Sequence, residues 1–146
     1  MHAPGPWARE AATPAGCRAG KGGGRLVDPR ILLSGLWAAL MLTFLLGDVL
    51  RIFAGDVTPG EILGRRPGQG LWLLIAAIML IPIVMLVLNL MLAYPAIRWV
   101  NIVVAIFFVV FNLLGLPYKG AYDNFLIGVS FVLNALTVWT AWHWMG

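Results

Sequence analysis

One carboxylate stands inside a strongly apolar segment of the chain, residues 42–53, with the sequence LTFLLGDVLRIF. The carboxylate is that of Asp48, and Arg51 follows about one helical turn later on the same face. An acidic side chain in an apolar helix can exchange a proton or contact a polar substrate, which is the chemistry of transport sites. It can also be structural, through a hydrogen bond to another helix or an ion pair with Arg51 at the membrane rim. The sequence leaves both interpretations open.

A second polar group consists of Asn89, Arg98 and Asn101, which lie within and on both sides of the short segment AYPAIRW at residues 93–99. Arg98 and Asn101 are three residues apart and share a helical face. Side chains of this kind can satisfy backbone groups that are left unpaired at the ends of two helices. We therefore interpret the three residues as a clamp of a tight helical hairpin. The alternative is a site for a lipid headgroup or a small anion on Arg98.

Motifs for catalysis and cofactor binding do not occur in the sequence. It contains no Ser-His-Asp set, phosphate-binding loop or nucleotide fingerprint. The two histidines, His2 and His143, lie at opposite ends of the chain, and Cys17 is the single cysteine, so a metal site, haem ligation and an intrachain disulfide are not expected. We predict a protein that is not an enzyme and has no cofactor.

The composition is that of a membrane protein. Of the 146 residues, 61% are hydrophobic and 11% are charged, against about 45–50% and about 25% in an ordinary soluble domain. Half of the ten Lys and Arg residues lie in the first thirty positions, and Trp7 is the one aromatic residue among them. This distribution favours a tail at an anionic membrane surface and argues against nucleic-acid binding.

Four apolar runs, at about residues 31–53, 71–93, 97–117 and 124–145, provide the elements that must position these polar residues. Each is close to the roughly 20 residues that a helix needs to cross a bilayer. Hydrocarbon offers no partner to backbone N–H and C=O groups, so the runs should be helices. The connection at 54–70 is a polar loop, whereas those at 94–96 and 118–123 are tight turns. Residues 31–146 are therefore predicted to form an all-α integral membrane four-helix bundle.

The helical rise places several polar side chains at one depth. Asp48 lies about 8 Å inside the end of the first run. Because chain direction alternates, Asn112 of the third run and Ser130 of the fourth should lie at the same level, with Asp123 and Asn124 just above them. We therefore expect Asp48, Arg51, Asn112 and Ser130 to form a polar cluster within the bundle.

Residues 1–30 are rich in Gly, Ala and Pro, have no apolar periodicity and are predicted to be a disordered basic tail. The end of the bundle that holds this tail carries six Lys and Arg residues, against four at the other end, which favours both termini in the cytoplasm. If the tail residues other than Arg30 are left out, the count of Lys and Arg is two against four, and the favoured orientation reverses.

An ordered set of short motifs resembles the bacterial membrane proteins grouped as domain of unknown function 6326. The motifs are LSGLW (residues 33–37), GDV (47–49), PG (59–60), Ile81-Pro82 with Met85, the pattern Y...RW.NI from Tyr94 to Ile102, and W.AW.W from Trp139 to Trp144. The resemblance covers the whole membrane part. It implies a four-span protein of the bacterial inner membrane and adds no activity.

The chain departs from this family pattern at two places. Thr43, Phe44 and Leu46 occupy positions where such proteins often have Asn and Tyr, and Ser130 stands where some carry an acidic residue. The departure at Ser130 argues against a site of two carboxylates in the bundle.

Two functions fit the sequence. The first is binding or assembly in the lipid bilayer, as a homo-oligomer or as part of a larger membrane complex. The second is that of a transporter or channel subunit which uses Asp48. Against transport, Asp48 is far from the midplane, where coupled sites usually lie, and Arg51 follows it.

Overall fold

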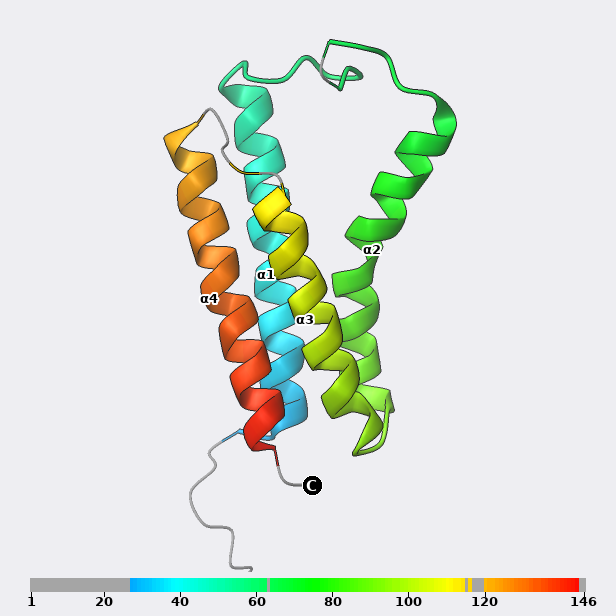
Figure 1. The fold of residues 1–146 in the computed structure, drawn as a ribbon, viewed down its shortest axis with the longest axis vertical. Coiled ribbons are helices and arrows are strands. Elements are labelled where there is room, and N and C mark those ends of the chain that lie inside the picture. Colours follow the sequence, from blue (N-terminus) through cyan, green and yellow to red (C-terminus); the bar gives the residue numbers. More distant parts are fainter. Residues whose placement is uncertain (1–26, 63, 115, 117–119, 145–146) are drawn as a thin grey trace, which may run out of the picture.

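The computed structural model describes residues 27–62, 64–114, 116 and 120–144. The described residues form four helices, and their order along the chain is α1 (Pro29–Phe53), α2 (Gln69–Met91), α3 (Ala96–Leu114) and α4 (Ala121–His143). Successive helices run in opposite directions, so α1 begins and α4 ends at the same end of the bundle (Figure 1). We call this the terminal end, and we call the opposite end, which holds residues 54–68, the loop end. The predicted fold class, an all-α four-helix bundle, is confirmed.

Local sequence explains several helix ends. Asp28 caps α1, because its side chain accepts a hydrogen bond of 2.8 Å from the backbone N–H of Arg30. Pro29 follows in the first turn, where a helix tolerates the missing N–H group. After α1 the chain turns at Gly55, whose φ of 74° is readily adopted only by a residue without a Cβ atom. Pro95 separates α2 from α3.

The helices are long and apolar enough to cross a membrane. They contain between 19 and 25 residues, which at 1.5 Å per residue gives about 28–38 Å against a hydrocarbon thickness of about 30 Å. Large apolar side chains such as Leu42, Leu73 and Val103 are exposed on the outer surface of the bundle. Such a surface is suited to lipid, and the chain is a multi-pass membrane protein by the length and composition of its helices.

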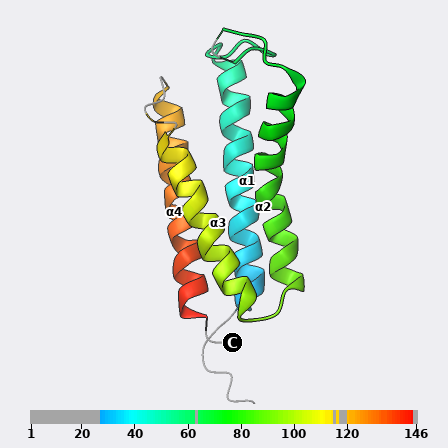
Figure 2. The same cartoon turned by 45° about the vertical axis from the view of Figure 1, so that its right-hand side comes forward.

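The helices do not pack with equal closeness. α1 packs against α2 and α4, and α3 packs mainly against α4. At one α1–α4 contact, Gly47 is buried next to Leu126. α2 and α3 are close at their short connection and diverge toward the loop end (Figures 1 and 2). The bundle is therefore tightest at its terminal end.

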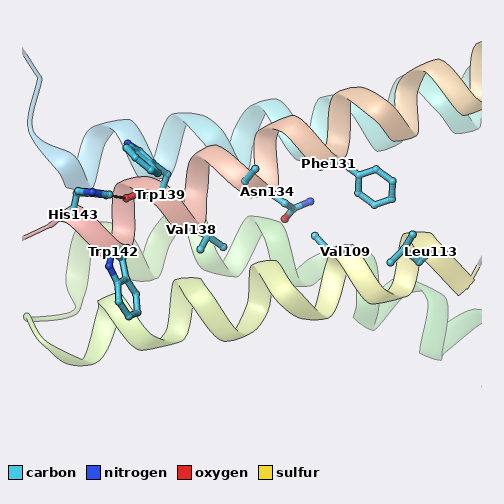
Figure 3. A pocket seen from close by; sticks show the side chains of 9 residues that line it. Val109, Leu113, Phe131, Asn134, Val138, Trp139, Trp142 and His143 are labelled. Carbon is cyan, nitrogen blue, oxygen red and sulfur yellow. Dashed lines mark hydrogen bonds between the residues drawn. The ribbon is translucent and has the colours of Figure 1, made fainter.

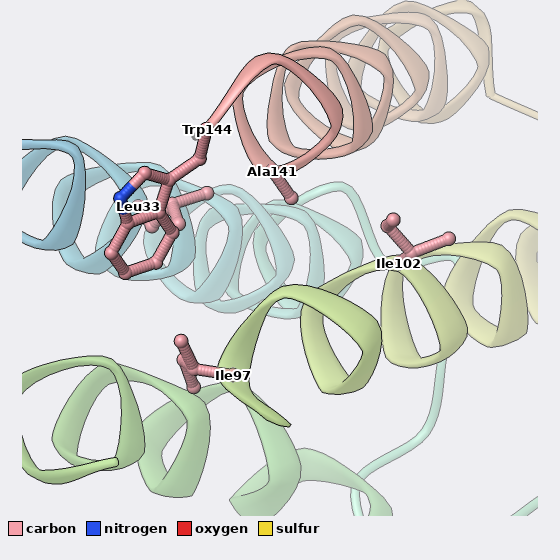
Figure 4. Packing of buried hydrophobic residues seen from close by; sticks show 5 residues of the cluster. All are labelled: Leu33, Ile97, Ile102, Ala141 and Trp144. Atoms are coloured by element: carbon pink, nitrogen blue, oxygen red, sulfur yellow. The ribbon is translucent and has the colours of Figure 1, made fainter. Parts of the chain in front are cut away.

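Two apolar clusters form the core. The first, at the terminal end, consists of Leu33, Ile97, Ile102, Ala141 and Trp144, so it joins α1, α3 and the end of α4 (Figure 4). The second lies deeper and consists of Trp37, Leu40, Met85, Ala105 and Phe108. Its aromatic pair, Trp37 and Phe108, is arranged edge to face with ring centroids 6.1 Å apart.

The predicted spans differ from the helices by no more than three residues at either end. The largest differences are at the end of α3, which is residue 114 and not 117, and at the start of α4, which is residue 121 and not 124. One assignment is corrected: Pro29 and Arg30 were placed in the disordered tail but begin α1, because Asp28 caps the helix. The remainder of the predicted tail, residues 1–26, lies outside the described residues, as does Cys17.

Candidate functional site

An ion cluster occupies the loop end of the bundle. Arg51 of α1 donates through Nε to both carboxylate oxygens of Asp123 in α4, each at 3.0 Å. Its Nη1 atom lies 3.4 Å from Oδ1 of Asp48. The side chain of Asp123 is only 7% exposed, whereas that of Asp48 is 54% exposed. Arg51 thus joins a buried and an exposed carboxylate, and the three groups together carry one negative charge.

A crevice of about 240 Å³ runs beside this cluster. Asp48, Arg51 and Asp123 form its polar wall, and apolar side chains from the other helices, including Ile75 of α2 and Phe111 of α3, face them. The crevice lies where α2 and α3 diverge toward the loop end (Figure 1). It is therefore a hollow that the exposed carboxylate of Asp48 lines.

Asn112 and Ser130 form the next polar contact toward the membrane interior. Nδ2 of Asn112 donates to Oγ of Ser130 at 3.0 Å, and the Ser130 hydroxyl donates to the carbonyl of Ile127 at 2.8 Å. The helical rise placed Asn112 and Ser130 at one depth, and the structure joins them. Asp48 does not hydrogen-bond to either; in the described part of the chain its polar contact is Arg51. The expected contacts of Asp48 with Asn112 and Ser130 are therefore wrong, whereas the alternative, an ion pair with Arg51, is the contact that the structure shows.

Substitution of Ser130 by alanine is expected to have a small effect. The change removes one interhelical hydrogen bond, and such bonds in membrane proteins contribute about 0.6 kcal/mol on average. Because Asn112 also lines the crevice, its amide can find another partner. Unfolding in mixed micelles should show a loss below about 1 kcal/mol. A loss several times larger would mean that the Asn112–Ser130 contact organises the cluster above it.

The terminal half of the bundle holds a separate amide network. Asn101 of α3 accepts a hydrogen bond of 2.7 Å from Nε1 of Trp37 in α1. Its Nδ2 group donates to Oδ1 of Asn89 in α2 at 2.6 Å and to the carbonyl of Ile97 at 2.8 Å. All three side chains are almost completely buried. Asn101 therefore connects three helices.

This network corrects the predicted hairpin clamp in two respects. Asn89 and Asn101 do join α2 to α3, but their backbone partners are the carbonyls of Met85 and Ile97, four residues earlier in each helix. Trp37, which no sequence motif assigned to this group, is the third member. The indole N–H of a buried tryptophan needs an acceptor. This requirement is the signal that could have identified Trp37 as a member of the network.

Arg98 does not belong to the amide network. Its guanidinium carbon lies 5.1 Å from the ring centroid of Trp142 in α4 and 5.9 Å from that of Trp99. These distances are typical of cation–π contacts. The Nε atom of Arg98 is buried without a hydrogen-bond partner among the described residues. The alternative prediction, an anion or lipid headgroup at Arg98, stays a prediction.

On α3, an apolar layer separates the polar groups at the two ends of the bundle. Along α3, Ala105 and Phe108 stand between Asn101 and Asn112, and both are completely buried. The ring of Phe108 contacts that of Phe44, with centroids 5.6 Å apart, beneath the crevice. On α4, by contrast, Asn134 and Thr137 are buried at about this level. Each donates to the carbonyl four residues earlier in α4, so these hydrogen bonds do not reach the Asn101 network.

Two carboxylates at the loop end were not included in the predicted cluster. Asp123, which the sequence places just above that cluster, enters from the first turn of α4 and is the partner of Arg51. The departure at Ser130 argued against a site of two carboxylates, but Asp48 and Asp123 both line the crevice. Asp56 accepts a hydrogen bond from the hydroxyl of Tyr122 and ties the loop to α4. The sequence signal that could have identified Asp123 as the partner of Arg51 is its position in the first turn of α4, at the loop end where Arg51 lies. No cluster of three or more His, Cys, Asp or Glu residues suited to a metal ion occurs in the part of the chain that the structure describes.

Comparison with known proteins gives no match: neither a protein family, nor a curated protein, nor a solved structure corresponds to this chain. The resemblance to domain of unknown function 6326 therefore stays a prediction.

Proposed function

We propose that the protein works by binding and assembly in the membrane, and that the loop-end crevice is the place where it binds. The observation that carries this proposal is the apolar layer of α3, where the buried Ala105 and Phe108 stand between the two polar groups. Such a division favours a packed protein that binds at one end over a conduit that passes a solute across the bilayer.

The charge of the crevice favours a cationic partner group. Arg51 is engaged by both oxygens of Asp123, so its charge is directed mainly to the buried carboxylate. Asp48 makes only a long contact of 3.4 Å with Arg51 and has most of its surface exposed. A basic side chain of another membrane protein, or of a second copy of this chain, would therefore find an acceptor in Asp48.

Transport is the second candidate, and one specific observation favours it. Asp48, the exposed acid of α1, lines a hollow of about 240 Å³. An acid that faces a cavity within a membrane protein is a common feature of substrate and proton pathways. In this case the crevice would be one half of an alternating-access path, and the apolar layer below it would have to open.

Substitution of Asp48 by asparagine separates the two functions. Because Asp48 is half exposed and its ion pair is long, we expect little change in stability, below about 1 kcal/mol. The variant should lose the complex that the wild-type protein forms in its native membrane, because the cationic group loses its acceptor. The measurement is the size of the complex after mild extraction, together with proton and cation flux in proteoliposomes.

The control is Asp56→Asn, which removes a carboxylate of the same end that does not line the crevice. Flux in the wild-type protein that Asp48→Asn abolishes would establish transport in place of assembly. Unchanged complex size and unchanged flux in Asp48→Asn would show that both interpretations of Asp48 are wrong.

A further inference from the structure

An apolar groove of about 660 Å³ lies between α3 and α4 and shares no lining residue with the loop-end crevice. Figure 3 shows Val109 and Leu113 of α3 on one side and Phe131 and Val138 of α4 on the other. The lining residues of α4 extend from Phe131 to His143, a length of about 18 Å along the helix. The groove is thus elongated along α4, and its lining is mostly apolar.

The amide side chain of Asn134 lies in the middle of this groove, whereas His143 lines its terminal end. Asn134 of α4 is 1% exposed, and it lies between α4 and the facing Val109 of α3 (Figure 3). Its Nδ2 group donates to the carbonyl of Ser130 at 2.8 Å, and its Oδ1 atom is buried without a partner among the described residues. The orientation of the amide is fixed, because a carbonyl can only accept and the Nδ2 group must face it.

Two other helical asparagines show what the third one lacks. Asn89 and Asn101 each donate to the carbonyl four residues earlier, as Asn134 does. In both of them Oδ1 accepts a hydrogen bond from another helix: Asn89 accepts from Asn101, and Asn101 accepts from Trp37. Asn134 has the same anchor, but its Oδ1 acceptor lies beside the groove and has no partner among the described residues.

The depth of Asn134 makes this acceptor costly to leave unpaired. The residue lies nine positions before the end of α4, His143, which is about 13 Å from that end. Hydrocarbon at this depth supplies no donor, and a buried acceptor without a hydrogen bond costs about 1–3 kcal/mol. A donor that enters the groove would remove this penalty.

We propose that the groove binds a lipophilic phenol or alcohol, whose hydroxyl group donates to Oδ1 of Asn134 and whose hydrocarbon body lies against Val109, Leu113, Phe131 and Val138. The hydroxyl supplies the missing donor, and the apolar lining matches the rest of such a molecule. A small molecule fits better than a helix of a second copy, because Asn134 is recessed to 1% exposure and the backbone of a facing helix cannot approach it.

The test uses a photoactivatable alkylphenol and its methyl ether, which differs by one methyl group on the oxygen and has no donor. Both are titrated into the full-length protein in nanodiscs, and labelled peptides are mapped. The phenol should label α3 and α4 beside the groove, with half-saturation at a concentration about fivefold lower than the ether, the change expected for one hydrogen bond. In Asn134→Leu the binding of the phenol should weaken about fivefold, to the level of the ether, and the binding of the ether should be unchanged.

The matched control is Asn124→Leu, which removes another α4 asparagine with the same bond to the carbonyl four residues earlier, outside the groove. It should leave both probes unchanged. Equal half-saturation of phenol and ether in the wild-type protein would overturn the proposal, and this comparison does not depend on the folding of any variant. Efficient disulfide formation between two copies of a Cys17→Ser/Val138→Cys protein would also overturn it, because a second copy would then occupy the groove.

Discussion

Replacing Arg51 with glutamine is expected to destabilise the bundle by about 3 kcal/mol, the lower end of the range for breaking a buried ion pair. The change leaves the Asp123 carboxylate, which is 7% exposed, without the two hydrogen bonds of 3.0 Å that Arg51 provides. It also leaves Asp48 and Asp123 as two like charges beside the same crevice. Arg51 itself is 27% exposed, which keeps the effect from being larger.

The free energy of unfolding in mixed micelles measures this effect, and a double variant isolates its cause. Arg51→Gln/Asp123→Asn removes both charges, so it should recover much of the stability that Arg51→Gln loses. Asp48→Asn is the matched control on the same helix face, with an expected loss below about 1 kcal/mol because its ion pair is exposed. If Arg51→Gln and Asp48→Asn cost the same, the Arg51–Asp123 pair does not hold α1 to α4.

Replacing Asn101 with leucine is expected to cost about 2–3 kcal/mol, because the change strands two buried polar groups. The indole N–H of Trp37 loses its acceptor at 2.7 Å, and Oδ1 of Asn89 loses its donor at 2.6 Å. Both groups lie in the tight, terminal half of the bundle, where the residues around them are buried. Few rearrangements can offer them new partners there, so the penalty should be close to that of full desolvation.

A second substitution, Trp37→Phe, tests whether the loss in Asn101→Leu comes from the unpaired indole N–H group. Trp37→Phe removes the stranded N–H group, so it should cost less in the Asn101→Leu protein than in the wild-type protein. The two residues should therefore show a coupling energy of about 1 kcal/mol or more in unfolding measurements. Asn124→Leu, at the exposed start of α4, is the matched asparagine control and should stay within about 0.5 kcal/mol of wild type. Additive effects of Asn101→Leu and Trp37→Phe would contradict the three-helix connection.

Both predictions concern polar contacts because apolar burial does little to hold helices together within lipid. Lipid tails are as apolar as the side chains that they replace, so helix association depends on packing and on interhelical hydrogen bonds. In this bundle Arg51 ties α1 to α4 at the loop end, and Asn101 ties α1, α2 and α3 at the terminal end. Among the residues that the structure describes, no such contact ties the loop-end half of α2 or crosses the groove beside Asn134. The two binding regions that we propose lie beside these parts.

The four helices could be predicted from the sequence because what determines them is local. Bilayer thickness sets the length of each apolar run, and hydrocarbon forces each run to pair its own backbone groups. The ends follow from nearby residues such as Asp28, Gly55 and Pro95, so the predicted limits are close to those of the helices. Depth is also a local quantity, because it follows from a fixed rise per residue. It placed Asn112 level with Ser130, and these two residues are hydrogen-bonded.

Which polar group meets which other group was decided by the tertiary structure. Depth says nothing about the rotation of a helix around its axis, and about 100° of rotation per residue separates a buried position from an exposed one. The rotation of the helices left Asp48 half exposed beside the crevice, placed Arg51 against Asp123, and placed Trp37 against Asn101. The same rotation points Asn134 into the α3–α4 groove, with its acceptor unpaired among the described residues. The sequence alone thus determined the spans and the levels of their polar residues, whereas the partners of those residues required the packing of all four helices.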